Sequence, residues 1–324
     1  MNKEHNKKHH IYFNEIDGIK ALSILGVVLV HSGFESRLSH EAIQLINVLR
    51  FFFGWCVVGF FFTSGYLNEK NNVTTAVLSD FIKKKIYRLI IPCFVFSITY
   101  KLILVFISSF SDFSWSMALP KNIGDFIFFL VKPVGPQFYF MAYLFFVSVI
   151  YSCIRAFFSV NYVLWILLLA IPFIYRCYFI PEYIYGQSFT LIPIYTVSYV
   201  IGAYFRDLKN TNVILFFCFY FIFLGFIYAS NVFMTISIPF FLFFIFTKWK
   251  NLSVFVNKSK LGKYSSAIYV WHAPIVLPFM SIISVRLIGN GRTAILLTLI
   301  LTIILCILIK KIVIRSPYLS LWHF

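Results

Sequence analysis

Long apolar segments separated by short polar connections run through almost the whole chain. A transmembrane helix needs about 20 apolar residues to cross the hydrocarbon core of a bilayer. About ten such segments can be read from the sequence, at 19–35, 43–67, 87–110, 137–158, 162–180, 188–205, 212–229, 231–247, 264–288 and 294–314. The pattern predicts an all-α, polytopic membrane protein with about ten transmembrane helices.

The composition supports this fold class and excludes the main alternatives. Of the 324 residues, 60% are hydrophobic and 12% are charged, whereas an average soluble domain is about 25% charged. A soluble enzyme, a secreted disulfide scaffold and a disordered chain are therefore excluded. No long polar region interrupts the pattern, so we expect residues 1–324 to form a single membrane-integral domain, with residues 1–15 as a cytosolic basic tail.

The distribution of positive charge predicts the orientation of the chain in the membrane. The net charge is +17, which on a soluble protein would suggest nucleic-acid binding. In a polytopic protein, however, Lys and Arg gather in cytosolic loops. With the N-terminus inside, 19 of the 28 Lys and Arg residues fall in inside segments and 6 in outside segments. We therefore expect both termini to be cytosolic and no nucleic-acid partner. The six scattered cysteines form no metal-ligand motif, so no metal site is expected.

Four ionisable side chains lie along the first apolar segment: Asp17, Lys20, His31 and Glu35. Lys20 and His31 are 11 residues apart, close to three helical turns, so they share one helix face about 16 Å apart. Asp17 can pair with Lys20 at i,i+3, and Glu35 can reach His31 at i,i+4. This stripe suits an anionic ligand at the inner end and a general base deeper in the membrane. Alternatively, Lys20 extends to the lipid headgroups and His31 only bridges two helices.

Two further groups of polar residues stand near apolar segments. His272 lies nine residues beyond Lys263 and two before Pro274. Because the proline weakens the helix backbone there, His272 is interpreted as a channel-lining residue or as a buried structural histidine. Lys85 and Arg88 belong to a dense basic patch just before the third segment. This patch suits the phosphates of a nucleotide-like ligand, or else the lipid headgroups.

Five stretches together resemble the membrane-integral acyltransferase family 3, whose members decorate bacterial surface glycans. The stretch from Ile16 to His31 resembles the opening helix of the family, with a basic residue, ten intervening residues and a histidine. The other four resemble the family's second-helix ending, its basic third-helix start, the start of its fourth helix and its late Ser-Tyr-His-Pro block; they are 58–67, 84–92, 135–143 and 261–274.

The resemblance implies an O-acyltransferase with an acyl-CoA donor, most simply acetyl-CoA, as a substrate and no bound cofactor. Lys20, Lys85 and Arg88 would then face the donor, and His31 would act as general base or transient acyl carrier. Glu35, assigned from its spacing alone, would orient His31.

The acceptor implied by the resemblance is a hydroxyl of a surface polysaccharide or lipid-linked sugar. His272, Asp17 and Gln137 are expected to line the channel or substrate site; His272 would line the channel or polarise the acyl carbonyl, and Gln137 stands where many members have histidine. The expected location is the bacterial inner membrane, in contact with its lipids. Two alternatives remain at this point: an exporter of polysaccharide or lipid-linked glycan, and a membrane glycosyltransferase. The oligomeric state is not predicted.

Overall fold

The computed structural model describes residues 13–32, 38–68, 75–108, 122–124, 138–156, 158, 192–207, 211–227 and 231–315. All regular elements in these ranges are helices, which confirms the all-α fold class. They are α1 (Asn14–His31), α2 (His40–Phe53), α3 (Cys56–Tyr66), α4 (Thr75–Lys85), the π-helical η2 (Ile86–Ile90), α5 (Ile91–Ser108), α7 (Tyr139–Arg155), α9 (Ile192–Asp207), α10 (Thr211–Ile227), α11 (Asn231–Lys248), α12 (Lys250–Lys258), α13 (Leu261–Trp271), the π-helical η5 (His272–Val276), α14 (Leu277–Ile288) and α15 (Arg292–Arg315).

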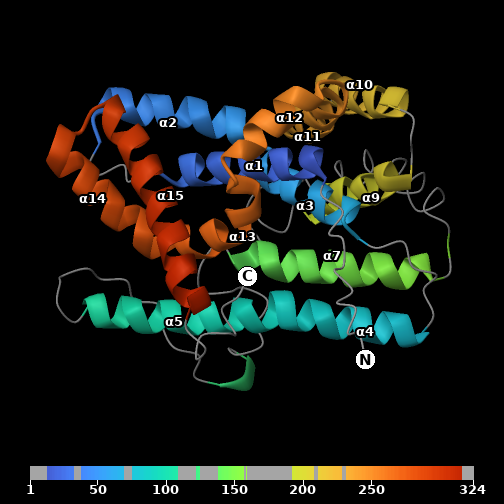
Figure 1. Cartoon of the computed structure of the whole chain (residues 1–324), viewed down its shortest axis with the longest axis horizontal. Helices are drawn as coiled ribbons and strands as arrows, with labels where there is room; N and C mark the ends of the chain where they lie inside the picture. The colour runs from blue at the N-terminus through green and yellow to red at the C-terminus, as the bar shows by residue number, and fades with distance from the viewer. Residues whose placement is uncertain are drawn as a thin grey trace, which may run out of the picture.

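Helix α1 lies in the middle of the bundle (Figure 1). It packs against α13, α3, α12, α2 and α11, so neighbours from both halves of the sequence surround it. Below it in this view, α4, η2 and α5 run end to end along one edge, with α7 beside them. The described part of the predicted stripe, Asp17, Lys20 and His31, therefore lies on the central helix of the bundle.

Nine of the ten predicted apolar segments overlap described helices; the tenth, 162–180, lies outside the described residues. Two described helices, 40–66 and 292–313, are each long and apolar enough to cross a membrane. The pair α11 and α12 adds a third if it forms one span, although it bends by 105° at the junction. The predicted segment 43–67 falls within the candidate span 40–66, in which α2 and α3 are joined by a turn at Gly54–Trp55. The segment 264–288, predicted as a single span, contains an internal break at Ala273.

The surface of the bundle carries many large apolar side chains. On α10, Phe219, Phe223 and Phe226 are 61–72% exposed, and similar side chains are exposed on α5, α14 and α15. A soluble protein would not leave so many large apolar groups in water. The chain is a membrane protein, and these side chains suit contact with lipid.

Glycines allow two of the central helix pairs to approach closely. A Cβ atom on Gly65 of α3 would overlap the backbone carbonyl of Tyr199 of α9, and one on Gly202 would overlap the carbonyl of Phe62. In the same way, Gly262 of α13 lies against the carbonyl of Asp17 of α1. Such small residues bring helix backbones together in membranes, and the last contact fixes α13 beside the stripe of α1.

Candidate active site

A partly open cavity of about 730 Å³ lies where α1, α3, η2, α7 and α13 meet. Its polar lining combines charged side chains with hydroxyl groups, and its apolar wall combines aromatic with aliphatic and methionine side chains. The lining residues are Asp17, Lys20, Phe60, Thr63, Ser64, Arg88, Leu89, Phe140, Met141, Leu144, Gly262, Lys263, Ser265, Ser266, Tyr269 and Val270. We call this cavity the basic pocket.

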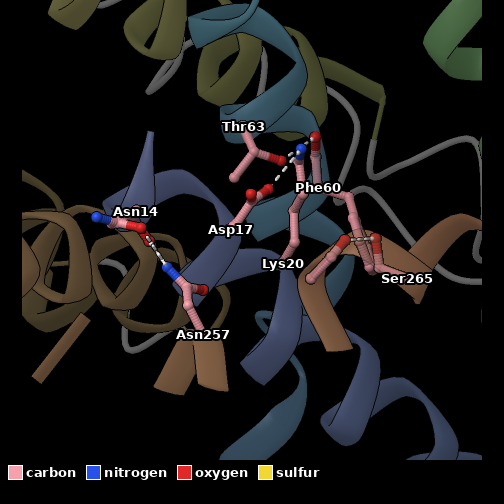
Figure 2. A network of polar contacts seen from close by, with 8 residues as sticks. Asn14, Asp17, Lys20, Phe60, Thr63, Asn257 and Ser265 are labelled. Carbon is pink, nitrogen blue, oxygen red and sulfur yellow. Dashed lines mark hydrogen bonds and ion pairs between the residues drawn. The ribbon is translucent and has the colours of Figure 1, made fainter. Parts of the chain in front are cut away.

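Lys20 and Asp17 form an ion pair inside the basic pocket. The Nζ atom of Lys20 lies 3.2 Å from Oδ1 of Asp17, and the two side chains are 22% and 17% exposed. Figure 2 shows both groups beside Thr63 of α3. The i,i+3 pairing predicted from the sequence is confirmed, and it holds the Lys20 ammonium at the pocket wall. In the same view, Asn257 of α12 donates to Asn14, which joins α12 to the start of α1.

Lys20 is joined at the pocket by two more cations, Arg88 from η2 and Lys263 from α13. Among the described lining residues, three positive groups thus face one carboxylate, which leaves an excess charge of +2. Clustered cations of this kind suit phosphate oxygens, which bind Lys and Arg through charge-assisted hydrogen bonds. The pocket is therefore chemically suited to an anionic ligand with phosphate groups.

Lys85 does not reach the pocket wall with this cluster, although the sequence predicts it beside Arg88. It is not among the described residues that line the basic pocket. Its Nζ atom lies 5.2 Å from the centre of the Phe81 ring on the same helix. Burial, with a smaller contribution from the charge of Arg88, lowers the pKa of Lys85 to about 8. The structure thus favours Arg88 over Lys85 as a ligand-facing cation.

The two candidate histidines meet at the other end of the α1–α13 pair. His31 is the last residue of α1 and His272 follows the last residue of α13. The centres of their rings are 5.6 Å apart, with 40° between the ring planes. Two residues 241 positions apart in the sequence are thereby brought together. The predicted residues Glu35 and Gln137 lie outside the described residues.

Aromatic side chains connect the basic pocket with the histidine pair. Tyr269 lines the pocket, and its ring centre lies 5.8 Å from that of His272. Phe60 and Phe140 line the same pocket and pack against Tyr269 at 6.2 and 5.0 Å between ring centres. A row of packed aromatic rings therefore links the basic pocket to His272, which lies beside His31.

Sequence reasoning missed Lys263 as a pocket residue and Arg50 as a neighbour of the histidine end. Lys263 stands at the start of an apolar segment, where a lysine is ordinarily interpreted as a topology signal. Arg50 donates from Nε to the carbonyl of Val30, next to His31. Each residue reaches its position through packing between separate helices, which periodicity along one segment does not reveal.

Among the described residues, no group of three or more His, Cys, Asp or Glu side chains could hold a metal ion.

The model of one protein family, described as an acyltransferase domain, matches residues 13–311. This range includes the basic pocket and both histidines. No curated protein and no solved structure matches the chain.

Proposed function

The chain belongs to the acyltransferase family 3, and we propose that it is an O-acyltransferase with acyl-CoA as donor. The family match makes it a membrane-bound acyltransferase that transfers groups other than aminoacyl groups. The proposal adds the donor, most simply acetyl-CoA, and the acceptor, a hydroxyl of a surface polysaccharide or lipid-linked sugar. The observation that carries it is the basic pocket at one end of the helix pair that carries the two histidines.

The pocket fits the anionic part of CoA. The Lys20, Arg88 and Lys263 side chains offer positive charge to phosphate groups, and Ser64 and Ser266 add hydroxyl groups. Along α1, Lys20 and His31 are separated by about 16 Å at 1.5 Å per residue. The pantetheine arm of CoA is an extended chain, so a donor held by its phosphates would carry its thioester toward His31.

The transfer step uses His31 as general base. A ring nitrogen of His31 removes the proton of the acceptor hydroxyl while the oxygen attacks the thioester carbonyl. A new C–O bond forms as the C–S bond breaks, and the sulfur leaves as the CoA thiolate. His31 then returns the proton to this sulfur. The products are an O-acyl ester and free CoA, and the histidine is restored.

The membrane arrangement follows the same proposal. We infer about ten transmembrane helices in a single domain over residues 1–324, with both termini cytosolic and the chain in the bacterial inner membrane. In this orientation the basic pocket, near the start of α1, opens on the cytosolic side where CoA is found. His31 then lies nearer the outer side, where a surface glycan is reached. The family match gives no support to the exporter alternative.

The test is donor turnover by the purified protein in lipid vesicles. Acetyl-CoA labelled in the acetyl group is supplied with a lipid-linked glycan fraction, and transfer of label to the glycan is measured together with release of the CoA thiol. Wild type should give equal amounts of both, and His31→Ala should give neither while still inserting in the vesicles. Transfer of label by His31→Ala at the wild-type rate would contradict the assignment of the base.

A further inference from the structure

His272 is a fully buried histidine whose two ring nitrogens have different surroundings. Its Nδ1 atom lies 2.7 Å from the carbonyl oxygen of Tyr269 and 3.1 Å from that of Ile268. A carbonyl oxygen only accepts hydrogen bonds, so the proton of the ring must lie on Nδ1. In the neutral ring, Nε2 then carries a lone pair and no hydrogen.

This Nε2 lone pair has no hydrogen-bond partner among the described residues, although the side chain is 0% exposed. A buried polar atom without a partner is costly and calls for an explanation. In this tautomer, Nε2 has no proton to offer a carbonyl, so His272 is not suited to polarise the acyl group. The atom requires a donor. The ring of His31 lies 5.6 Å away between centres but donates no hydrogen bond to Nε2 in this structure, so a turn of the His31 ring is needed to supply one.

The backbone around His272 departs from a regular helix. Ala273 has φ −123° and ψ 151°, which are extended rather than helical dihedrals, and the π-helical η5 spans His272–Val276. Pro274 has no N–H group and so cannot continue the ladder to the carbonyl of Val270. This break lies directly after His272, which remains tied through Nδ1 to the last turn of α13. The ring orientation is thereby fixed from its own helix.

Resting on the proposed function, we propose that Nε2 of His272 accepts a hydrogen bond from one ring N–H of His31. That bond fixes the His31 tautomer and leaves the other His31 nitrogen unprotonated toward the acceptor hydroxyl. His272 is then a positioning residue that acts through His31, much as carboxylates and carbonyls orient catalytic histidines elsewhere.

The His31–His272 pair is also consistent with the path of the hydroxyl proton during acyl transfer. When His31 takes the hydroxyl proton, both its nitrogens carry hydrogen, and the N–H facing His272 stays paired with the Nε2 lone pair. The proton that arrived from the hydroxyl leaves to the CoA sulfur. The His31–His272 bond is unbroken throughout, and His272 neither gains nor loses a proton.

Two variants separate this role from a structural one. His272→Gln places an amide acceptor near the position of Nε2, whereas His272→Asn keeps a donor near Nδ1 and has no acceptor at Nε2. We expect His272→Asn to lower kcat by at least about tenfold with an unchanged KM for acetyl-CoA, and His272→Gln to retain most of the activity. If His272 were purely structural, His272→Asn would retain more activity than His272→Gln. That result would overturn the proposal, and so would full activity in both variants. His40, which is exposed and contacts Gln44 on its own helix, provides the matched control with the same two substitutions.

A measurement independent of activity tests the hydrogen bond itself. In protein labelled with nitrogen-15 histidine and reconstituted in bilayers, His272 should show a protonated Nδ1 and an unprotonated Nε2. A nitrogen–nitrogen coupling across the hydrogen bond should join this Nε2 to a ring nitrogen of His31, and it should vanish in His31→Ala. If both His272 variants lose activity, the coupling in wild type decides whether the His31–His272 hydrogen bond exists. Absence of the coupling in wild type overturns the proposal. If the coupling is present but wild type transfers no acyl group, the proposed function fails and the histidine pair stands.

Discussion

Replacing Lys20 by methionine removes one positive charge from the basic pocket while keeping an unbranched apolar stem. The Lys20 side chain is 22% exposed and its Nζ atom lies 3.2 Å from Oδ1 of Asp17, so the ammonium is held in place before any ligand binds. A hydrogen bond from a charged group contributes about 1.5–3 kcal/mol, and each 1.4 kcal/mol is about tenfold in affinity. Asp17 already uses part of the strength of the ammonium, which favours the lower end. We therefore expect about a tenfold weaker binding of acyl-CoA.

The assay is the concentration dependence of acetyl transfer in vesicles, with direct binding of labelled acetyl-CoA as a second readout. The KM and Kd for the donor should both rise about tenfold, and kcat should change little. Lys258→Met is the matched control, because Lys258 is exposed on α12 and is not among the described lining residues of the basic pocket. An unchanged KM in Lys20→Met, or an equal rise in Lys258→Met, would refute the assignment of this pocket to the donor.

The remaining predictions concern the other walls of the pocket. Arg88→Ala should raise the donor KM by about tenfold, whereas Lys85→Ala, away from the pocket, should change it by less than about twofold; equal effects measured by donor titration would contradict the placement of the two cations. Gly262→Val should lower stability by about 1–3 kcal/mol, because its side chain would overlap the carbonyl of Asp17. Gly291→Ala, with open space around it, should not. Thermal unfolding in detergent compares the two, and an equal loss in both would remove the argument from close packing.

Features that depend on one helix could be predicted from the sequence. The spacing of Lys20 and His31 predicts one face of one helix, and α1 runs unbroken from Asn14 to His31. The Asp17–Lys20 ion pair follows from the same periodicity and is confirmed. The all-α class follows from the apolar pattern, because backbone groups in lipid must be satisfied within helices.

Features that depend on contacts between distant segments could not be predicted in this way. The approach of His31 and His272 needs α13 to lie against α1, which the absence of a Cβ atom at Gly262 permits. The inclusion of Lys263 and the exclusion of Lys85 depend on how α13 and α4 are turned in the bundle. Periodicity along one segment predicts which residues share a helix face, but not which other helix packs against that face.

Proton NMR of purified surface glycan tests the proposed acyl transfer in the cell, with three strains: wild type, a deletion strain, and the deletion strain carrying His31→Ala. We expect O-acyl signals in wild type and none in the other two, with equal amounts of glycan in all three. O-acylation that persists in the deletion strain, or loss of the glycan itself, would contradict it.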